Sequence, residues 1–199
     1  MLGDSHVSMM DRFNASYGIN SISVAGAGLV TLDAFLEKER IFNRNVSALF
    51  LLCGGNDLAK HKSPEWVVTV LKEIVEKIEK SNPKCLVVSG TIIPRQTDKL
   101  TGNTFVEKVE EVDKMVEKYA NGHHHFVTDL LVGEPSQKTG EVGPRHPYFE
   151  RDKVHLSGVG REEFRKLLAF VYDSVNLNRY GDRVELVQGR GFRSAFWKF

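Results

Sequence analysis

The sequence lacks several features that mark special classes of protein. Only two of its 199 residues are cysteine, so no disulfide framework is expected and a reducing, cytoplasmic location is favoured. No apolar run approaches the ~20 residues that cross a bilayer, and no signal peptide is visible. The formal net charge is only +1, which provides no general basic surface for nucleic acid or anionic membranes. We therefore expect neither a disulfide scaffold nor an integral membrane protein.

What is present is the composition of an ordinary globular domain, with 41% hydrophobic and 27% charged residues. One domain is expected over residues 1–180. Residues 181–199 interleave basic and aromatic side chains and are expected to form a C-terminal extension. Such a mixture can bind single-stranded nucleic acid, so a nucleic-acid partner, if there is one, is expected to bind this extension. The favoured interpretation is an extension whose aromatic side chains pack on the core, or a partly disordered terminus.

Apolar segments alternate with amphipathic ones along the chain. Strands are predicted for the short apolar segments 21–25, 46–53, 84–93 and 126–131. Helices are predicted where apolar residues recur with helical spacing, over 29–40, 64–81, 105–119 and 162–175. The alternation predicts an α/β fold, with a parallel sheet covered by helices on both faces.

The first predicted turn comes unusually early in the sequence. Only Met1 and Leu2 precede Gly3-Asp4-Ser5. A buried central strand usually needs about five or six residues. The first strand is therefore expected to be truncated, which would leave part of the sheet unpaired.

Four segments at the ends of predicted strands or before a predicted helix supply the parts of an acyl-transfer site. Ser5 is a hydroxyl nucleophile, which needs a base to remove its proton. His155 is the candidate base, and Asp152, three residues earlier, is the candidate group that orients it. Asn56 offers a side-chain amide to a tetrahedral oxyanion, together with the backbone N–H groups of Ser5 and Gly28.

The glycine of the second segment has an alternative, because both Gly26 and Gly28 follow a predicted strand. Gly28 is preferred, since a helical stretch begins directly after it. The same glycines do not make a dinucleotide fingerprint, because Thr31 stands at the third glycine position.

These segments together resemble the SGNH hydrolases, also called the GDSL esterase/lipase family. The matching blocks are Gly3-Asp4-Ser5, Gly26-Ala27-Gly28, Gly54-Gly55-Asn56-Asp57 and Asp152-Lys153-Val154-His155. The resemblance covers roughly residues 3 to 175 and implies a flavodoxin-like, three-layer α/β/α fold. The α/β-hydrolase nucleophile elbow is a different arrangement, and its Gly-x-Ser-x-Gly motif does not occur in this sequence.

The resemblance also implies roles for particular residues. Ser5, His155 and Asp152 would be catalytic, and Ser5, Gly28 and Asn56 would form the oxyanion hole. No metal and no organic cofactor would be needed. The expected reaction is hydrolysis of a carboxylic ester of a small molecule through an acyl-enzyme on Ser5.

The substrate is expected to carry a short or polar acyl group, because the loops that follow Asn56 and Pro94 are polar. Their cationic side chains, which also suit an anionic substrate, are Lys60, Lys62, Arg95 and Lys99. The alternative is an esterase-like binding or assembly module, since domains resembling this family occur in the first open reading frame of some LINE-type retrotransposons.

Histidine and cysteine also occur where they could be reactive, and both are interpreted as structural. His123 and His125 would share one side of a strand and could chelate a metal, but the sequence places no third ligand with them. Cys53, just before the Gly-Gly-Asn turn, is interpreted as a buried packing residue rather than a reactive thiol.

Overall fold

A computed structural model gives the arrangement of most of the chain. It describes residues 1–8, 10, 20–38, 46, 48–95, 105–119, 124–179 and 192–195. The strands are β1 (Leu2–Gly3), β2 (Ile22–Ser23), β3 (Ala48–Leu52), β4 (Leu86–Gly90), β5 (His124–Thr128) and β6 (Phe192–Ala195). The helices are α1 (Ser5–Ser8), α3 (Leu29–Lys38), α4 (Gly55–Ala59), α5 (Pro64–Ser81), α6 (Phe105–Tyr119) and α7 (Gly158–Arg179).

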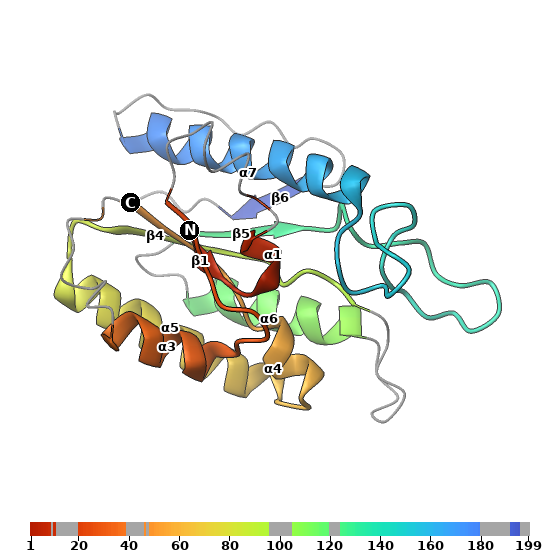
Figure 1. Cartoon of the computed structure of the whole chain (residues 1–199), viewed down its shortest axis with the longest axis horizontal. Coiled ribbons are helices and arrows are strands. Elements are labelled where there is room, and N and C mark those ends of the chain that lie inside the picture. Colours follow the sequence, from red (N-terminus) through yellow and green to blue (C-terminus); the bar gives the residue numbers. More distant parts are fainter. Residues whose placement is uncertain are drawn as a thin grey trace.

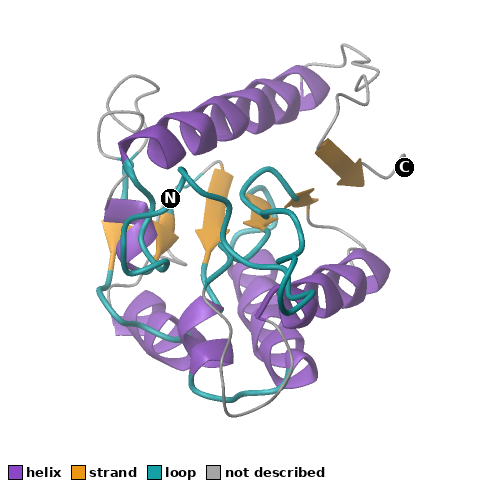
Figure 2. Cartoon of the chain, turned by 90° about the vertical axis from the view of Figure 1, so that its right-hand side faces the viewer, coloured by secondary structure: helices purple, strands orange, loops and turns teal. Residues whose placement is uncertain are grey.

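The strands form one sheet in the order β2-β1-β3-β4-β5-β6. Strands β1 to β5 are parallel, as predicted, and β6 adds an antiparallel edge to β5. The order 2-1-3-4-5 of the parallel strands is the flavodoxin-like one. In Figure 1, α7 covers one face of the sheet, while α3, α5 and α6 cover the other. Figure 2 shows the same layers from the side at which the loops gather.

The alternation of side chains along β3 explains the two apolar cores. Leu49 and Leu51 pack into the cluster formed with α3, α5 and α6. Phe50 and Leu52 point to the other face, where they join the side chains of α1 and α7. A strand that is buried on both faces must be apolar at every position, which is why 46–53 has no polar alternation.

Local signals account for where two of the helices begin. Helix α5 has its predicted bounds, and the Ser63 side chain accepts a hydrogen bond of 3.2 Å from the Trp66 N–H. Helix α7 starts four residues before the predicted 162, at Gly158. The reason is an N-cap that the periodicity did not reveal, since the Ser157 hydroxyl accepts from the Gly160 N–H at 3.2 Å.

Other boundaries also differ from the sequence predictions. Strand β5 begins at His124 rather than 126 and ends at Thr128. The observed β1 and β2 have two residues each, so the first strand is as short as expected. Part of the expected C-terminal extension, Phe192–Ala195, pairs with β5, while 181–191 and 196–199 lie outside the described residues. Within the described residues, no helix is long and apolar enough to cross a membrane.

A buried polar network joins α6 to the middle of the sheet. The His125 ring contacts the Ser89 hydroxyl at 2.8 Å through Nδ1 and the Asp113 carboxylate at 3.0 Å through Nε2. The Thr91 hydroxyl donates to the same carboxylate at 2.6 Å. Each of these side chains is buried, with at most 5% of any residue exposed. Both nitrogens of the His125 ring therefore have partners, which argues against the metal interpretation.

Candidate active site

The carboxyl ends of β1 and β3 bring together two of the predicted site segments. The strand order reverses between these two neighbours, and open α/β sheets bind their ligands at such a point. Ser5 is the first residue of α1, directly after β1, and Asn56 lies in α4, shortly after β3. A long loop over 129–157 projects from the right-hand end of the molecule in Figure 1 and carries Asp152 and His155.

The three predicted catalytic side chains form one chain of contacts. The Ser5 Oγ lies 3.5 Å from Nε2 of His155, and Nδ1 of His155 lies 2.7 Å from the Asp152 carboxylate. Since an ionised carboxylate only accepts, Nδ1 carries the proton and Nε2 is left to accept from the serine hydroxyl. The first contact is at the long end of the hydrogen-bond range, as is common in sites without substrate.

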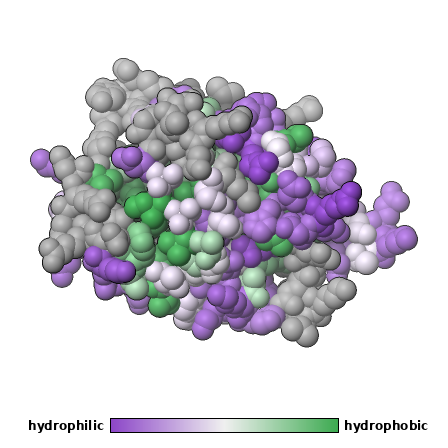
Figure 3. Space-filling model, in the orientation of Figure 1, coloured by the Kyte–Doolittle hydropathy of each residue, from purple (hydrophilic) through white to green (hydrophobic). Residues whose placement is uncertain are grey.

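The Asp152 carboxylate closes the turn that carries the base. Its second oxygen accepts the backbone N–H groups of Val154 and His155, at 2.9 and 3.0 Å. Hydrogen bonds from the His155 ring, and then from these two N–H groups, hold the pKa of Asp152 below its ordinary value. The pair lies at the surface, with the His155 side chain 39% and the Asp152 side chain 49% exposed. Figure 3 shows that this end of the molecule is largely hydrophilic.

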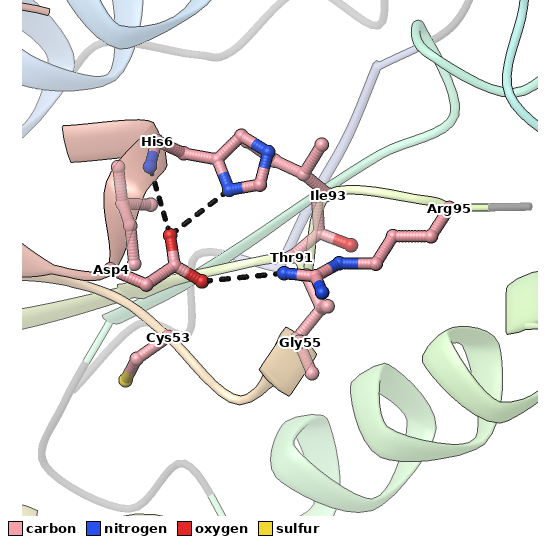
Figure 4. Close-up of a pocket in the computed structure, with 9 residues that line it drawn as sticks. Asp4, His6, Cys53, Gly55, Thr91, Ile93 and Arg95 are labelled. Atoms are coloured by element: carbon pink, nitrogen blue, oxygen red, sulfur yellow. Dashed lines mark hydrogen bonds and ion pairs between the residues drawn. The ribbon is translucent and has the colours of Figure 1, made fainter. Parts of the chain in front are cut away.

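The Asp4 carboxylate lies between His6 and Arg95 (Figure 4). One carboxylate oxygen accepts from the backbone N–H of His6 at 3.0 Å and lies 2.9 Å from the ring Nδ1 of the same residue. The other lies 3.7 Å from the Arg95 guanidinium and 3.5 Å from the amide nitrogen of Asn56. Burial alone would raise the pKa of Asp4, but the contacts with His6, and then the charge of Arg95, hold it below its ordinary value.

The Asn56 side chain connects the second and third predicted segments. Its amide donates to the Ala27 carbonyl at 2.9 Å, and its contact with Asp4 is longer, at 3.5 Å. The amide has two hydrogens, so the one near Asp4 is the one that can turn towards an oxyanion. Among the described residues, no hydrogen-bond partner is found for the Gly28 N–H.

The two candidate glycines differ in their contact with Asp57. Its carboxylate accepts the Leu29 N–H at 2.9 Å and lies against Gly28, where an added Cβ would overlap it. Gly26, in contrast, has a φ of 69° and no atom within 4 Å of such a Cβ. The structure therefore places Gly28, rather than Gly26, against the Asn56-Asp57 turn. Burial raises the pKa of Asp57, in opposition to the bond from Leu29.

Cys53 is partly buried and packs against the apolar cluster of α3, α5 and α6. Burial, together with the nearby carboxylates of Asp4 and Asp57, raises the pKa of its thiol well above the ordinary value. In Figure 4 its sulfur points away from the Asp4 carboxylate. The thiolate, which is the reactive form of cysteine, is therefore disfavoured at this position, in agreement with the packing interpretation.

A small hollow opens beside these residues, and Asp4, His6, Cys53, Ile93 and Arg95 are among the side chains that line it. The room in it is about that of one water molecule. The Arg95 Nε atom is buried here and has no hydrogen-bond partner among the residues that the structure describes. The predicted pocket residue Lys99 lies outside the described residues. The described residues contain no cluster of three or more His, Cys, Asp or Glu side chains that could hold a metal ion.

Sequence reasoning missed two side chains of this site. His6 follows Ser5 directly, but a lone histidine after a turn carries no spacing signal. It lies with its ring 5.8 Å from that of His155. Arg95 is identifiable from the sequence only as a loop cation, whereas in the structure it is largely covered and lies near Asp4. Its partners come from strand ends that are distant in sequence, so only the fold reveals them.

Comparison with known proteins supports the family suggested by the motifs. The family model of the GDSL-like lipases/acylhydrolases matches residues 3–162. No curated protein matches the sequence significantly.

Solved structures agree with the fold. A GDSL-like lipase from Bacteroides thetaiotaomicron superposes with a TM-score of 0.71 at 14% identity, over 87% of this chain and 86% of that chain. A member of the lipolytic G-D-S-L family from Veillonella parvula superposes with a TM-score of 0.58 at 19% sequence identity, over 85% of this chain and 96% of that chain. A carbohydrate esterase of family 3 from Talaromyces cellulolyticus superposes with a TM-score of 0.60 at 14% sequence identity, over 87% of this chain and 97% of that chain. With its first four-fifths covered by the family model and its sheet in the matching order, the chain belongs to the GDSL-like lipase/acylhydrolase family.

Proposed function

We propose that this protein is a serine esterase that uses Ser5 as its nucleophile. Membership of a lipase/acylhydrolase family already assigns it to the ester-hydrolysing enzymes. The observation that carries the finer proposal is the chain of contacts from the Ser5 hydroxyl through His155 to Asp152. A serine hydroxyl becomes a good nucleophile when such a base removes its proton.

The proposed reaction has two stages. Ser5 Oγ attacks the acyl carbonyl while His155 Nε2 takes its proton, and the imidazolium is stabilised by Asp152. The oxyanion accepts from the N–H groups of Ser5 and Gly28 and from the Asn56 amide. His155 then gives its proton to the departing alcohol, which leaves an acyl-enzyme. Water that is deprotonated by His155 releases the acid and restores Ser5.

We also propose a short or polar acyl group as the substrate. In the described part of the site, the hollow beside Asp4 has room for about one water molecule, and it is not a pocket for a long chain. The guanidinium of Arg95, whose side chain is 11% exposed, favours an anionic or oxygen-rich group at this place over a hydrocarbon. Burial lowers the pKa of Arg95, in opposition to the charges of Asp4 and Asp152, so an added anion would stabilise its charged form.

Labelling with a fluorophosphonate tests the nucleophile. The folded protein should gain the mass of one adduct, and peptide mapping should locate it on Ser5, because the reagent reacts with activated serines. The same protein unfolded in urea should take none, since the activation depends on the assembled site. A folded protein that takes no adduct would contradict the proposal and favour a binding role instead.

Chain-length preference tests the proposed substrate class. The kcat/KM for p-nitrophenyl acetate is expected to exceed that for p-nitrophenyl decanoate by about tenfold or more, because a few misplaced methylenes cost about 1–3 kcal/mol each. Both esters should be assayed below the concentration at which the longer one forms micelles. A preference for the decanoate would refute the short-chain proposal and leave the serine mechanism intact.

A further inference from the structure

The base and the nucleophile of the proposed reaction come from very different surroundings. Ser5 begins α1 beside the sheet, next to a fully buried residue, His6, which is 3% exposed. Asp152 and His155 lie in a surface loop, and Lys153 between them has a φ of 54°, in the left-handed region. A residue other than glycine in that region is strained and persists where its surroundings hold it. Something must therefore fix this turn against Ser5.

The bonds within the loop do not supply that connection. The Glu150 N–H donates to the His155 carbonyl at 2.8 Å, and Phe149 pairs with Leu156. The Asp152 carboxylate caps the turn from inside, as described above. These contacts give the turn its shape, and the buried Leu156 attaches its end to the core. They do not set the distance between His155 and the nucleophile.

His6 makes the missing link. Its Nε2–H donates to the Val154 carbonyl at 3.0 Å, a bond between residues 148 positions apart in the sequence. On its other side, Nδ1 and the backbone N–H contact the buried carboxylate of Asp4, which holds the ring in place. The carbonyl of Val154 belongs to the peptide group that carries the His155 N–H. Fixing this peptide group therefore fixes where the His155 ring begins.

We infer that His6 is a positioning residue that holds the acid–base turn against Ser5 through the Val154 carbonyl. This role rests on the proposed serine mechanism, since it matters only if His155 acts on Ser5. Both ring nitrogens of His6 are engaged, with Asp4 and with Val154, so neither is left to act on the reacting atoms. Because the Ser5–His155 contact is already 3.5 Å long, a small outward shift of the turn would break it.

Two conservative variants test the two contacts of the His6 ring separately. In His6→Asn the amide nitrogen replaces Nδ1, so the bond to Asp4 is kept and the bond to Val154 is lost. In His6→Gln the amide nitrogen replaces Nε2, so the bond to Val154 is kept. For p-nitrophenyl acetate, we expect His6→Asn to lower kcat about 10²-fold, the loss that a misplacement of about 1 Å can cause, with KM nearly unchanged. His6→Gln should restore kcat to within about threefold of the wild type.

The measurements are kcat, KM and the rate of fluorophosphonate labelling, each on protein whose thermal melting shows that it is folded. Should His6→Asn not fold, His6→Met, which removes both bonds and retains bulk, replaces it in the comparison with His6→Gln. A merely structural role would lower stability in both variants and would give no selective rescue by glutamine.

The outcomes also separate this role from the proposed function. An active wild type with two fully active variants would overturn the positioning role, and so would equal losses of kcat in both. A folded wild type that neither hydrolyses the ester nor takes the label would overturn the proposed function, and the role of His6 with it. Loss in His6→Asn with rescue in His6→Gln supports both.

Discussion

Replacing Ser5 by alanine is expected to lower kcat for p-nitrophenyl acetate about 10⁴-fold or more. The variant has no nucleophile to form the acyl-enzyme, and only the oxyanion donors and substrate binding remain. His155→Ala should cause a loss of the same order, because an unassisted hydroxyl is a poor nucleophile. The two residues act as a unit through their contact of 3.5 Å. The double variant should therefore lose little more than either single variant.

Steady-state rates of the three variants measure this non-additivity directly. Ser23→Ala is a suitable control, since Ser23 is an exposed serine on the edge strand β2 and its loss should leave kcat unchanged. Residual activity within tenfold of the wild type in Ser5→Ala would show that another group attacks the ester. Independent, multiplying losses would show that His155 and Ser5 do not act in the same step.

The second large effect is expected on stability, from Asp113→Ala. Asp113 lies on α6, accepts a hydrogen bond from Thr91, which directly follows β4, and contacts His125 of β5. Its removal would leave a buried hydroxyl and a buried ring nitrogen without partners, in a place with no access for water. Each such orphaned group costs about 1–3 kcal/mol, so the free energy of unfolding should fall by about 3 kcal/mol.

Urea unfolding of the wild type and the variant gives this difference. Glu110→Ala is the matched control on the same helix, because Glu110 is exposed and its contact with Lys114 is an ordinary surface pair of 3.7 Å. Its loss should change stability by less than about 0.5 kcal/mol. An Asp113→Ala protein as stable as the control would mean that the network contributes little.

This network also contains serine, histidine and aspartate in contact, yet it is not expected to be catalytic. Ser89, His125 and Asp113 are each at most 5% exposed, so an ester cannot reach the hydroxyl. The proposed triad differs in just this respect, since His155 and Asp152 face solvent. Residue types alone therefore do not distinguish a catalytic set from a structural one.

The amino-acid sequence was enough to predict the layers of the fold and the proposed catalytic residues, although it did not reveal His6 or Arg95. Apolar runs such as 46–53 predict strands buried on both faces, and the helical spacing over 64–81 and 105–119 gave both helices their observed bounds. These signals are local, because the spacing of apolar residues along a strand or a helix can be read from consecutive residues of the sequence. The motifs around Ser5, Asn56 and His155 are local in the same way.

Tertiary structure alone decided which side chains meet. The pairing of β6 with β5 and the contact of Asp57 with Gly28 each depend on residues outside the motif concerned. The bond from His6 to Val154 joins residues 148 positions apart, and the network of Asp113 joins one helix to two strands. Such contacts have no periodic trace in a single sequence. They arise because parallel packing brings distant strand ends to one edge of the sheet, where burial forces each polar group to find a partner.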